Sequence, residues 1–189
     1  MDLQIDLRYE IDSYGADFVF NIHAAQTPHQ IVHNERLVLS QDIPHQIHTD
    51  PATGNRYLRL HGEPGMLELT YSATVDIRHH RADPTQLAEV PVRHLPPHVM
   101  GYIYPSRYCQ SDRLLRLALN EFGALWQGHS RVQAIRDWVN RHVAFTSNTS
   151  NSNTSAVDTL VEQVGVCRDF AHLMIALCRA VNIPARFTT

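Results

Sequence analysis

The residue that is best suited to catalysis is Cys167, which lies two residues after Gly165 at the start of a helix-forming apolar segment. The first turn of a helix carries unpaired backbone N–H groups and the positive end of the helix dipole. A thiolate is stabilised there, and the same N–H groups could hold a developing oxyanion. Gly165 would leave room for a substrate to approach closely. The pattern therefore predicts a cysteine nucleophile at Cys167.

Other reactive residues near Cys167 are weaker candidates. Cys178 lies deep in the same apolar run and is expected in the core as a small apolar side chain, an interpretation that also stays open for Cys167. His172 lies about 140° further round the helix than Cys167, so its imidazole is expected to point away from the sulfur. Asp169 is expected to pair with an arginine or to stabilise the first turn, and Cys109 has no identifiable role.

The segment after Cys167 is predicted to be a helix that ends before Pro184. Apolar residues cover most of its circumference, which is typical of a helix buried by its neighbours. Three earlier helices are expected, each with a serine at its N-cap: Ser111, Ser130 and Ser155. The third would pair Ser155 with Asp158 in a capping box and end at Gly165.

The first part of the chain alternates between apolar and polar residues, which is the period of a strand with one buried face. The alternation is clearest at 3–11 and 67–77, and turn-forming sequences such as "DPATGN" and "HGEPG" separate shorter runs. About five or six such strands without a helical period predict an antiparallel β-sandwich.

A change of composition near residue 90 divides the chain. Four prolines follow within a short stretch and cannot lie inside regular elements: Pro91, Pro96, Pro97 and Pro105. We expect an N-terminal β-sandwich domain at 1–95, a proline-rich junction at 96–110 and a helical region at 111–189. The expected fold class is therefore α+β.

Composition excludes several functions. The net charge is −3 without a basic stripe, which argues against a nucleic-acid partner. No apolar stretch approaches the roughly 20 residues of a membrane span, and the N-terminus lacks the features of a secretory signal, so no membrane association is expected. An odd count of three cysteines favours reduced thiols and a cytoplasmic location.

The chain has thirteen histidines, and none forms a helical metal-binding pair. His29 and His33 would lie on one face of a strand, but scattered surface histidines are the favoured interpretation. Metal storage or sensing remains an alternative hypothesis, while no metal or cofactor is expected. All sixteen basic residues are arginine, so the chain offers no lysine amine.

The segment "GVCRDFAHLMIALCRAVNIPARF" (165–187) resembles the nucleophile helix of the transglutaminase-like superfamily. In that family Gly-x-Cys opens a buried helix and Arg-x-x-Gly-Ile-Pro-x-Arg closes it, and this chain has Asn182 in place of the last glycine. Upstream, "AIRDWVNRHVAFT" resembles the approach to the cysteine, while "HLPPHVMGYIYPSRYCQSD" and the strand-rich start resemble the N-terminal β-domain of bacterial members.

The resemblance implies an N-terminal β-sandwich followed by the helical half of a papain-like core, with Cys167 as the nucleophile and a protein or peptide as substrate. In the family the cysteine attacks an amide carbonyl, usually that of glutamine, and an amine or water resolves the thioester. The family's catalytic histidine and aspartate lie downstream of the Ile-Pro-x-Arg element, and this sequence stops at Thr189.

We therefore expect a fragment of a transglutaminase-like cysteine enzyme that is inactive alone and that self-associates through its exposed half-domain. The alternative is a non-catalytic protein-interaction module that kept the scaffold.

Overall fold

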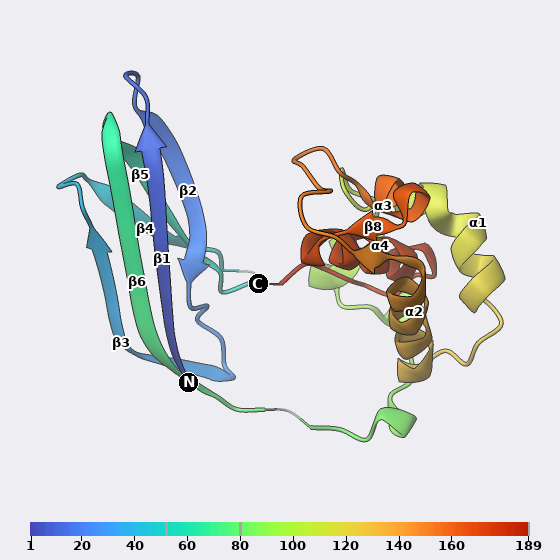
Figure 1. Ribbon diagram of the computed structural model, residues 1–189. Helices are drawn as coiled ribbons and strands as arrows, with labels where there is room; N and C mark the ends of the chain where they lie inside the picture. Colours follow the sequence, from blue (N-terminus) through green and yellow to red (C-terminus); the bar gives the residue numbers. More distant parts are fainter. Residues whose placement is uncertain (52, 80, 189) are drawn as a thin grey trace. The chain divides into compact units, whose positions relative to one another are not determined.

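The computed structural model describes residues 1–51, 53–79 and 81–188, which form two compact units, Met1–Arg81 and Ala82–Thr189 (Figure 1). The stretch 82–95, which composition groups with the strand-rich domain, lies in the second unit, where Glu89 forms an ion pair with Arg131. Within the described residues, no helix is both long enough and apolar enough to cross a membrane.

The described part of the first unit consists of antiparallel strands, as the alternating sequence predicts. They are β1 (Asp2–Ile11), β2 (Ala16–His23), β3 (Gln30–Leu39), β4 (His45–Thr49), β5 (Arg56–Gly62) and β6 (Gly65–Ile77). They form two three-stranded sheets, in the orders β1-β6-β3 and β2-β5-β4. Apolar residues of both sheets share one core, so the sheets pack face to face. The buried members are Ile11, Phe20, Leu58, Leu60, Leu67, Leu69, Tyr71 and Ala73.

A polar cluster lies between these two sheets. The Glu35 carboxylate accepts hydrogen bonds from the Arg56 guanidinium at 2.5 Å and from the Tyr71 hydroxyl at 2.7 Å. The Tyr71 oxygen in turn accepts the Ala24 N–H at 3.0 Å. Burial, together with the Glu35 carboxylate, raises the pKa of Tyr71 to about 12. Glu35 follows Asn34, whose left-handed backbone (φ 51°) lies in the register shift of β3, so local alternation gives no sign of this cluster.

The second unit is mainly helical, with a short parallel strand pair. Its helices are α1 (Ser111–Phe122), α2 (His129–His142), α3 (Ala156–Glu162) and α4 (Cys167–Ala180), and its strands are β7 (Ala144–Phe145) and β8 (Val164–Gly165). Short 3-10 helices precede α1: η1 (Pro84–Gln86), η2 (Val92–His94) and η3 (Pro97–Ile103). The mixed class with antiparallel sheets before helices is the one that the sequence predicts.

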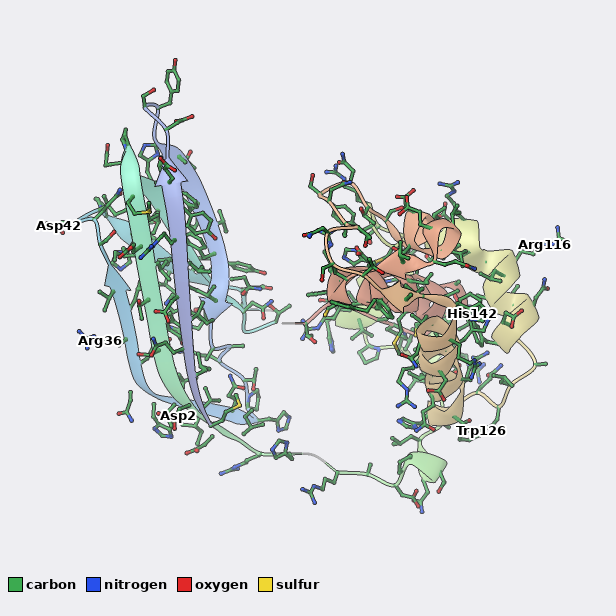
Figure 2. The ribbon with its side chains drawn as sticks, viewed as in Figure 1. Asp2, Arg36, Asp42, Arg116, Trp126 and His142 are labelled. Atoms are coloured by element: carbon green, nitrogen blue, oxygen red, sulfur yellow. The ribbon has the colours of Figure 1, made fainter. Side chains whose placement is uncertain are left out.

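Helix α4 is the central element of this unit because it contacts α1, α2 and α3 (Figure 1). Its apolar side chains Leu173, Ala176 and Leu177 are fully buried, as expected for a helix that is apolar over most of its circumference. Outer helices keep polar side chains on their free faces, and Figure 2 shows Arg116 extending from α1 away from α4. The core of the unit is therefore built around the helix that begins at Cys167.

The serine caps are only partly as predicted. Ser155 is the N-cap of α3 and forms the expected capping box. The prediction is wrong for the two earlier helices, because α1 has Gln110 and α2 has Gly128 at the N-cap, one or two residues before Ser111 and Ser130. For α2, backbone hydrogen bonds with the segment 87–89 fix the residues just before the helix, and such long-range pairing leaves no local signal.

Candidate active site

Cys167 is the first residue of α4, and its side chain is exposed, whereas Cys109 and Cys178 are buried. Burial, with the Glu89 carboxylate nearby, raises the pKa of the Cys178 thiol to about 12, and burial also raises the pKa of Cys109. The core position predicted for Cys178 is therefore confirmed. Among the three thiols, only that of Cys167 is both exposed and located at a helix N-terminus.

The strand pair β7–β8 positions the approach to Cys167. The Ala144 N–H donates to the Gln163 carbonyl at 2.8 Å, and the Thr146 N–H donates to the Gly165 carbonyl at 3.0 Å. Helix α3 ends at Glu162, with Gln163 as its left-handed C-cap (φ 57°), and not at Gly165 as the sequence suggests. Gly165 instead lies in β8, where its carbonyl accepts the Thr146 N–H.

Gly165 also has a different role from the predicted one. A Cβ atom at this position would lie 2.8 Å from the Cβ of Asp169, which is shorter than atoms of side chains approach one another. The space beside Gly165 is therefore filled by the Asp169 side chain, and the expectation that it admits a substrate is wrong. The glycine is required by packing within the first turn of α4.

Asp169 is fully buried and connects the start of α4 to the polar loop 146–154. One carboxylate oxygen accepts the Val166 N–H at 2.8 Å, and the other accepts the Ser150 hydroxyl at 2.8 Å and lies 3.5 Å from the Arg168 guanidinium. Arg168 also donates to the Ser150 oxygen at 2.5 Å and to the Asn151 carbonyl at 2.6 Å. The sequence places Asp169 in the first turn but gives no signal of its bond to Ser150.

Two backbone N–H groups at the helix start have no acceptor among the described residues. The N-cap residue is Val166, whose side chain cannot accept a hydrogen bond, and the first carboxylate oxygen of Asp169 is bound to the Val166 N–H. In the described part of the chain, no hydrogen bond engages the N–H of Cys167 or of Arg168. These groups are therefore available beside the exposed thiol, as the sequence predicts for the first turn.

His172 forms no hydrogen bond with Cys167 within the described residues. Its ring is buried and stacks on Tyr108, with centroids 5.2 Å apart and planes at 6°, and it lies 5.9 Å from the Phe187 ring. Burial and the nearby Arg168 guanidinium lower the pKa of His172, so this imidazole stays neutral at pH 7. Within residues 1–51, 53–79 and 81–188, no histidine forms a hydrogen bond with Cys167.

The end of α4 explains a departure from the family's sequence pattern. Asn182 takes the place of a glycine and has a left-handed backbone with φ 64°, a conformation that asparagine tolerates better than most residues. The turn is held by Arg179, which donates to the carbonyls of Ala185 at 2.9 Å and Tyr104 at 3.0 Å. Asn182 is therefore compatible with the left-handed turn between α4 and the Ile-Pro-x-Arg element.

His29 and His33, which the sequence favours as scattered surface histidines over a metal site, have separate surroundings. His33 lies 3.1 Å from the Asp76 carboxylate on the neighbouring strand, and His29 precedes β3. Among the described residues, no group of three or more His, Cys, Asp or Glu side chains is arranged to hold a metal ion.

Comparison with known proteins covers both units. The family model "Transglutaminase-like superfamily" matches residues 122–189, and the model "Bacterial transglutaminase, N-terminal domain" matches residues 1–98. A crystal structure of a candidate cysteine protease from Cytophaga hutchinsonii is 39% identical, with a TM-score of 0.89 over 97% of this chain and 67% of that chain.

Two further proteins match less closely. An uncharacterised protein of Mycobacterium leprae is 33% identical over 58 residues, which are 31% of this chain and 21% of that protein. The periplasmic domain of TgpA from Pseudomonas aeruginosa is 16% identical, with a TM-score of 0.42 over 95% of this chain and 54% of that chain. The match to the curated relative thus spans about a fifth of its length. From the family matches to both units and the close agreement with the Cytophaga structure, the chain belongs to the transglutaminase-like superfamily.

Proposed function

We propose that this chain is the nucleophile-bearing part of a cysteine enzyme that cleaves amide bonds in a protein or peptide, with Cys167 as its nucleophile. The observation that carries the proposal is the exposed thiol at the uncapped start of the buried helix α4. The 39% identity to a candidate cysteine protease favours water over an amine as the acyl acceptor.

The geometry supplies two parts of the reaction. The Cys167 thiolate attacks the carbonyl carbon of the amide, and the electron pair of the C=O bond moves to oxygen. The N–H groups of Cys167 and Arg168 can donate to this oxyanion because they have no other acceptor in the described residues. When the tetrahedral intermediate collapses, the C–N bond breaks, the amine leaves with a proton, and a thioester remains on Cys167.

The thioester is then resolved by water. Attack on its carbonyl carbon breaks the C–S bond, releases a carboxylic acid and returns the thiol. Both halves of the reaction need a group that moves protons to and from the sulfur and the leaving amine. His172 is buried against Tyr108 and does not suit this role. We therefore propose that a histidine and an aspartate outside residues 1–189 move these protons.

Alkylation of the native chain tests the nucleophile directly. We expect iodoacetamide at pH 7 to modify Cys167 at least about tenfold faster than Cys109 or Cys178, because thiolate character and exposure control the rate. Peptide mass spectrometry would measure each site, and the denatured chain, in which the three rates should converge, is the control. Equal rates in the native chain would contradict the proposal and favour the non-catalytic interaction module.

The chemistry itself is tested on the protein that the native gene encodes. If its reading frame continues past Thr189 into a histidine and an aspartate, that product should hydrolyse a peptide amide, and Cys167→Ala should abolish the activity. A buried-thiol variant, Cys178→Ala, is the matched control and should retain activity. Activity in the Cys167→Ala variant would overturn the assignment.

A further inference from the structure

The loop 146–154 consists of small polar residues, yet it is fixed to the rest of the second unit by contacts near its middle. The Tyr108 hydroxyl donates to the Ser152 carbonyl at 2.8 Å, and Arg168 donates to the Asn151 carbonyl at 2.6 Å. Ser150 lies between the Arg168 guanidinium and the Asp169 carboxylate. Most of these contacts come from the first turn of α4, so the loop borders the helix start that carries Cys167.

Asp169 is the residue that joins the loop to the helix start. Its two oxygens bind different partners, the Val166 N–H and the Ser150 hydroxyl, each at 2.8 Å. The side chain has no exposed surface, and Gly165 makes the space that it occupies. Two bonds in different directions, combined with close packing, leave the carboxylate one orientation. Both partners lie on segments that flank Cys167.

We infer that Asp169 is a positioning residue for the reaction at Cys167, acting through Val166 and Ser150 to hold the helix start and the loop 146–154 in place around the thiol. The inference rests on the proposed function. With its own N–H bound to Asp169, Val166 is held at the N-cap. That leaves the next two N–H groups at the helix end, where they stabilise a thiolate and an oxyanion.

A purely electrostatic role for Asp169 would have the opposite consequence. A carboxylate near a thiolate disfavours the charged sulfur, so its removal alone would let Cys167 react at lower pH. If positioning dominates, its removal lets the first turn fray, and Cys167 then reacts only at higher pH. The sign of the change therefore separates the two roles.

The test is the pH dependence of Cys167 alkylation by iodoacetamide, measured on the full chain between pH 5 and 9. In Asp169→Ala we expect the midpoint to rise by about one pH unit, because the first turn frays. A shift of one unit corresponds to about 1.36 kcal/mol. Asp169→Asn keeps an oxygen that can accept the Val166 N–H, and its midpoint should stay within about half a unit of the native value.

Asp158→Ala is the matched control. Asp158 makes the same contact in α3, where its carboxylate accepts the Ser155 N–H at 2.9 Å. This variant loses an equivalent helix-start bond at a site without a thiol, so the Cys167 midpoint should not move. A shift equal to that of Asp169→Ala would show a general loss of structure and overturn the inference.

The remaining outcomes are also decisive. An unchanged or lower midpoint in folded Asp169→Ala overturns the inference and leaves the proposed function standing. If Asp169→Ala does not fold by circular dichroism, Asp169→Asn and Ser150→Ala decide: the inference requires a near-native midpoint in the first and faster proteolysis of the loop 146–154 in the second. Native alkylation of Cys167 that is no faster than that of Cys109 and Cys178 would remove the proposed function and the inference together.

Discussion

Helices α3 and α4 begin only eleven residues apart, and their first turns differ in one respect. Each has an aspartate whose carboxylate accepts the N-cap N–H, Asp158 in α3 and Asp169 in α4. In α3 the N-cap is Ser155, which completes the reciprocal capping box, whereas in α4 it is Val166, which has no polar atom to contribute. We call the α3 start closed because a side chain caps it. We call the α4 start open because no side chain caps it and, among the described residues, the N–H groups of Cys167 and Arg168 have no acceptor.

This difference has a cost in stability and a consequence for the groups beside Cys167. A polar N-cap stabilises a helix by about 1 kcal/mol relative to an apolar residue. With Val166 at this position, α4 is therefore less stable than it would be with a serine there. What α4 retains, within the part of the chain that the structure describes, is a pair of N–H groups without an acceptor beside the exposed Cys167. Of these two helices, the chain thus caps α3, which has no thiol at its start, and leaves α4 without a side-chain cap beside Cys167, as it also leaves α1 and α2.

Gly165→Ala should have the largest effect, because it disrupts the open start itself. The new Cβ would lie 2.8 Å from the Asp169 Cβ, and overpacking of this kind costs about 1–3 kcal/mol. Urea denaturation at pH 7 would measure the loss. The control is Gly101→Ala, where the added Cβ meets no atom within 4 Å. Equal stability of the two variants would show that Asp169 is not held by Gly165.

Ser155→Ala should destabilise the closed start by about 1 kcal/mol, the usual value of an N-cap side chain. Its effect should be confined to stability, because the rate of Cys167 alkylation depends on the other helix. Ser152→Ala, which changes an exposed side chain and keeps the carbonyl bound by Tyr108, is the control. Slower alkylation in folded Ser155→Ala would show that the two helix starts are coupled.

Val166→Ser should convert the open start into a closed one. The serine oxygen can accept an N–H of the first turn, so we expect a stability gain of up to about 1 kcal/mol together with slower alkylation of Cys167. Val161→Ser, at a position of α3 that is 76% exposed, controls for the loss of an apolar side chain. A stabilised variant with native reactivity would refute the view that free N–H groups activate the thiol.

The smallest expected effect is on the pH dependence of stability. The pKa of His172 is lowered by burial from the ordinary value of 6.5, so the unfolded chain binds the proton more readily. Stability of the second unit is therefore complete above pH 6.5 and falls as the pH drops below it. His172→Phe, which keeps a ring to stack on Tyr108, should weaken this dependence.

The capping box of α3 affects stability at lower pH than His172 does, through the Asp158 carboxylate. Bonds from the side chain and backbone of Ser155 lower the pKa of Asp158 below its ordinary 3.8, so its contribution is present above that pH and is lost as the pH falls through the folded-state pKa. Fluorescence of Trp126 and Trp138, the two tryptophans of the chain, reports on the second unit in both ranges. A single transition that neither His172→Phe nor Ser155→Ala alters would contradict these assignments.

The features that sequence could predict depend on neighbours along the chain. Alternation identifies the strands, the Ser155–Asp158 spacing identifies the capping box, and the apolar run after Cys167 identifies the start of α4. Each is a local pattern in which propensity and packing agree. The catalytic role of Cys167 itself remains a prediction, since position and exposure permit that role without demonstrating it.

The features that sequence could not predict are contacts between distant residues. Asp169 meets Ser150 across nineteen positions, and Glu35 meets Arg56 across twenty-one, so no periodicity contains either pair. Gly165 carries a misleading signal, because a glycine after a helix is usually read as its end, whereas here it accommodates Asp169. Such residues become interpretable only once the fold brings their partners together.

The single exposed thiol has a practical consequence. Because every basic side chain is an arginine, residues 1–189 contain no lysine amine. A maleimide dye directed at Cys167 would therefore label the second unit at one defined point, and a lysine introduced at an exposed position of the first unit would give an amine-reactive dye one defined point there. Energy transfer between the dyes would follow the separation of the units in solution, and its change on adding a peptide would reveal whether substrate draws them together.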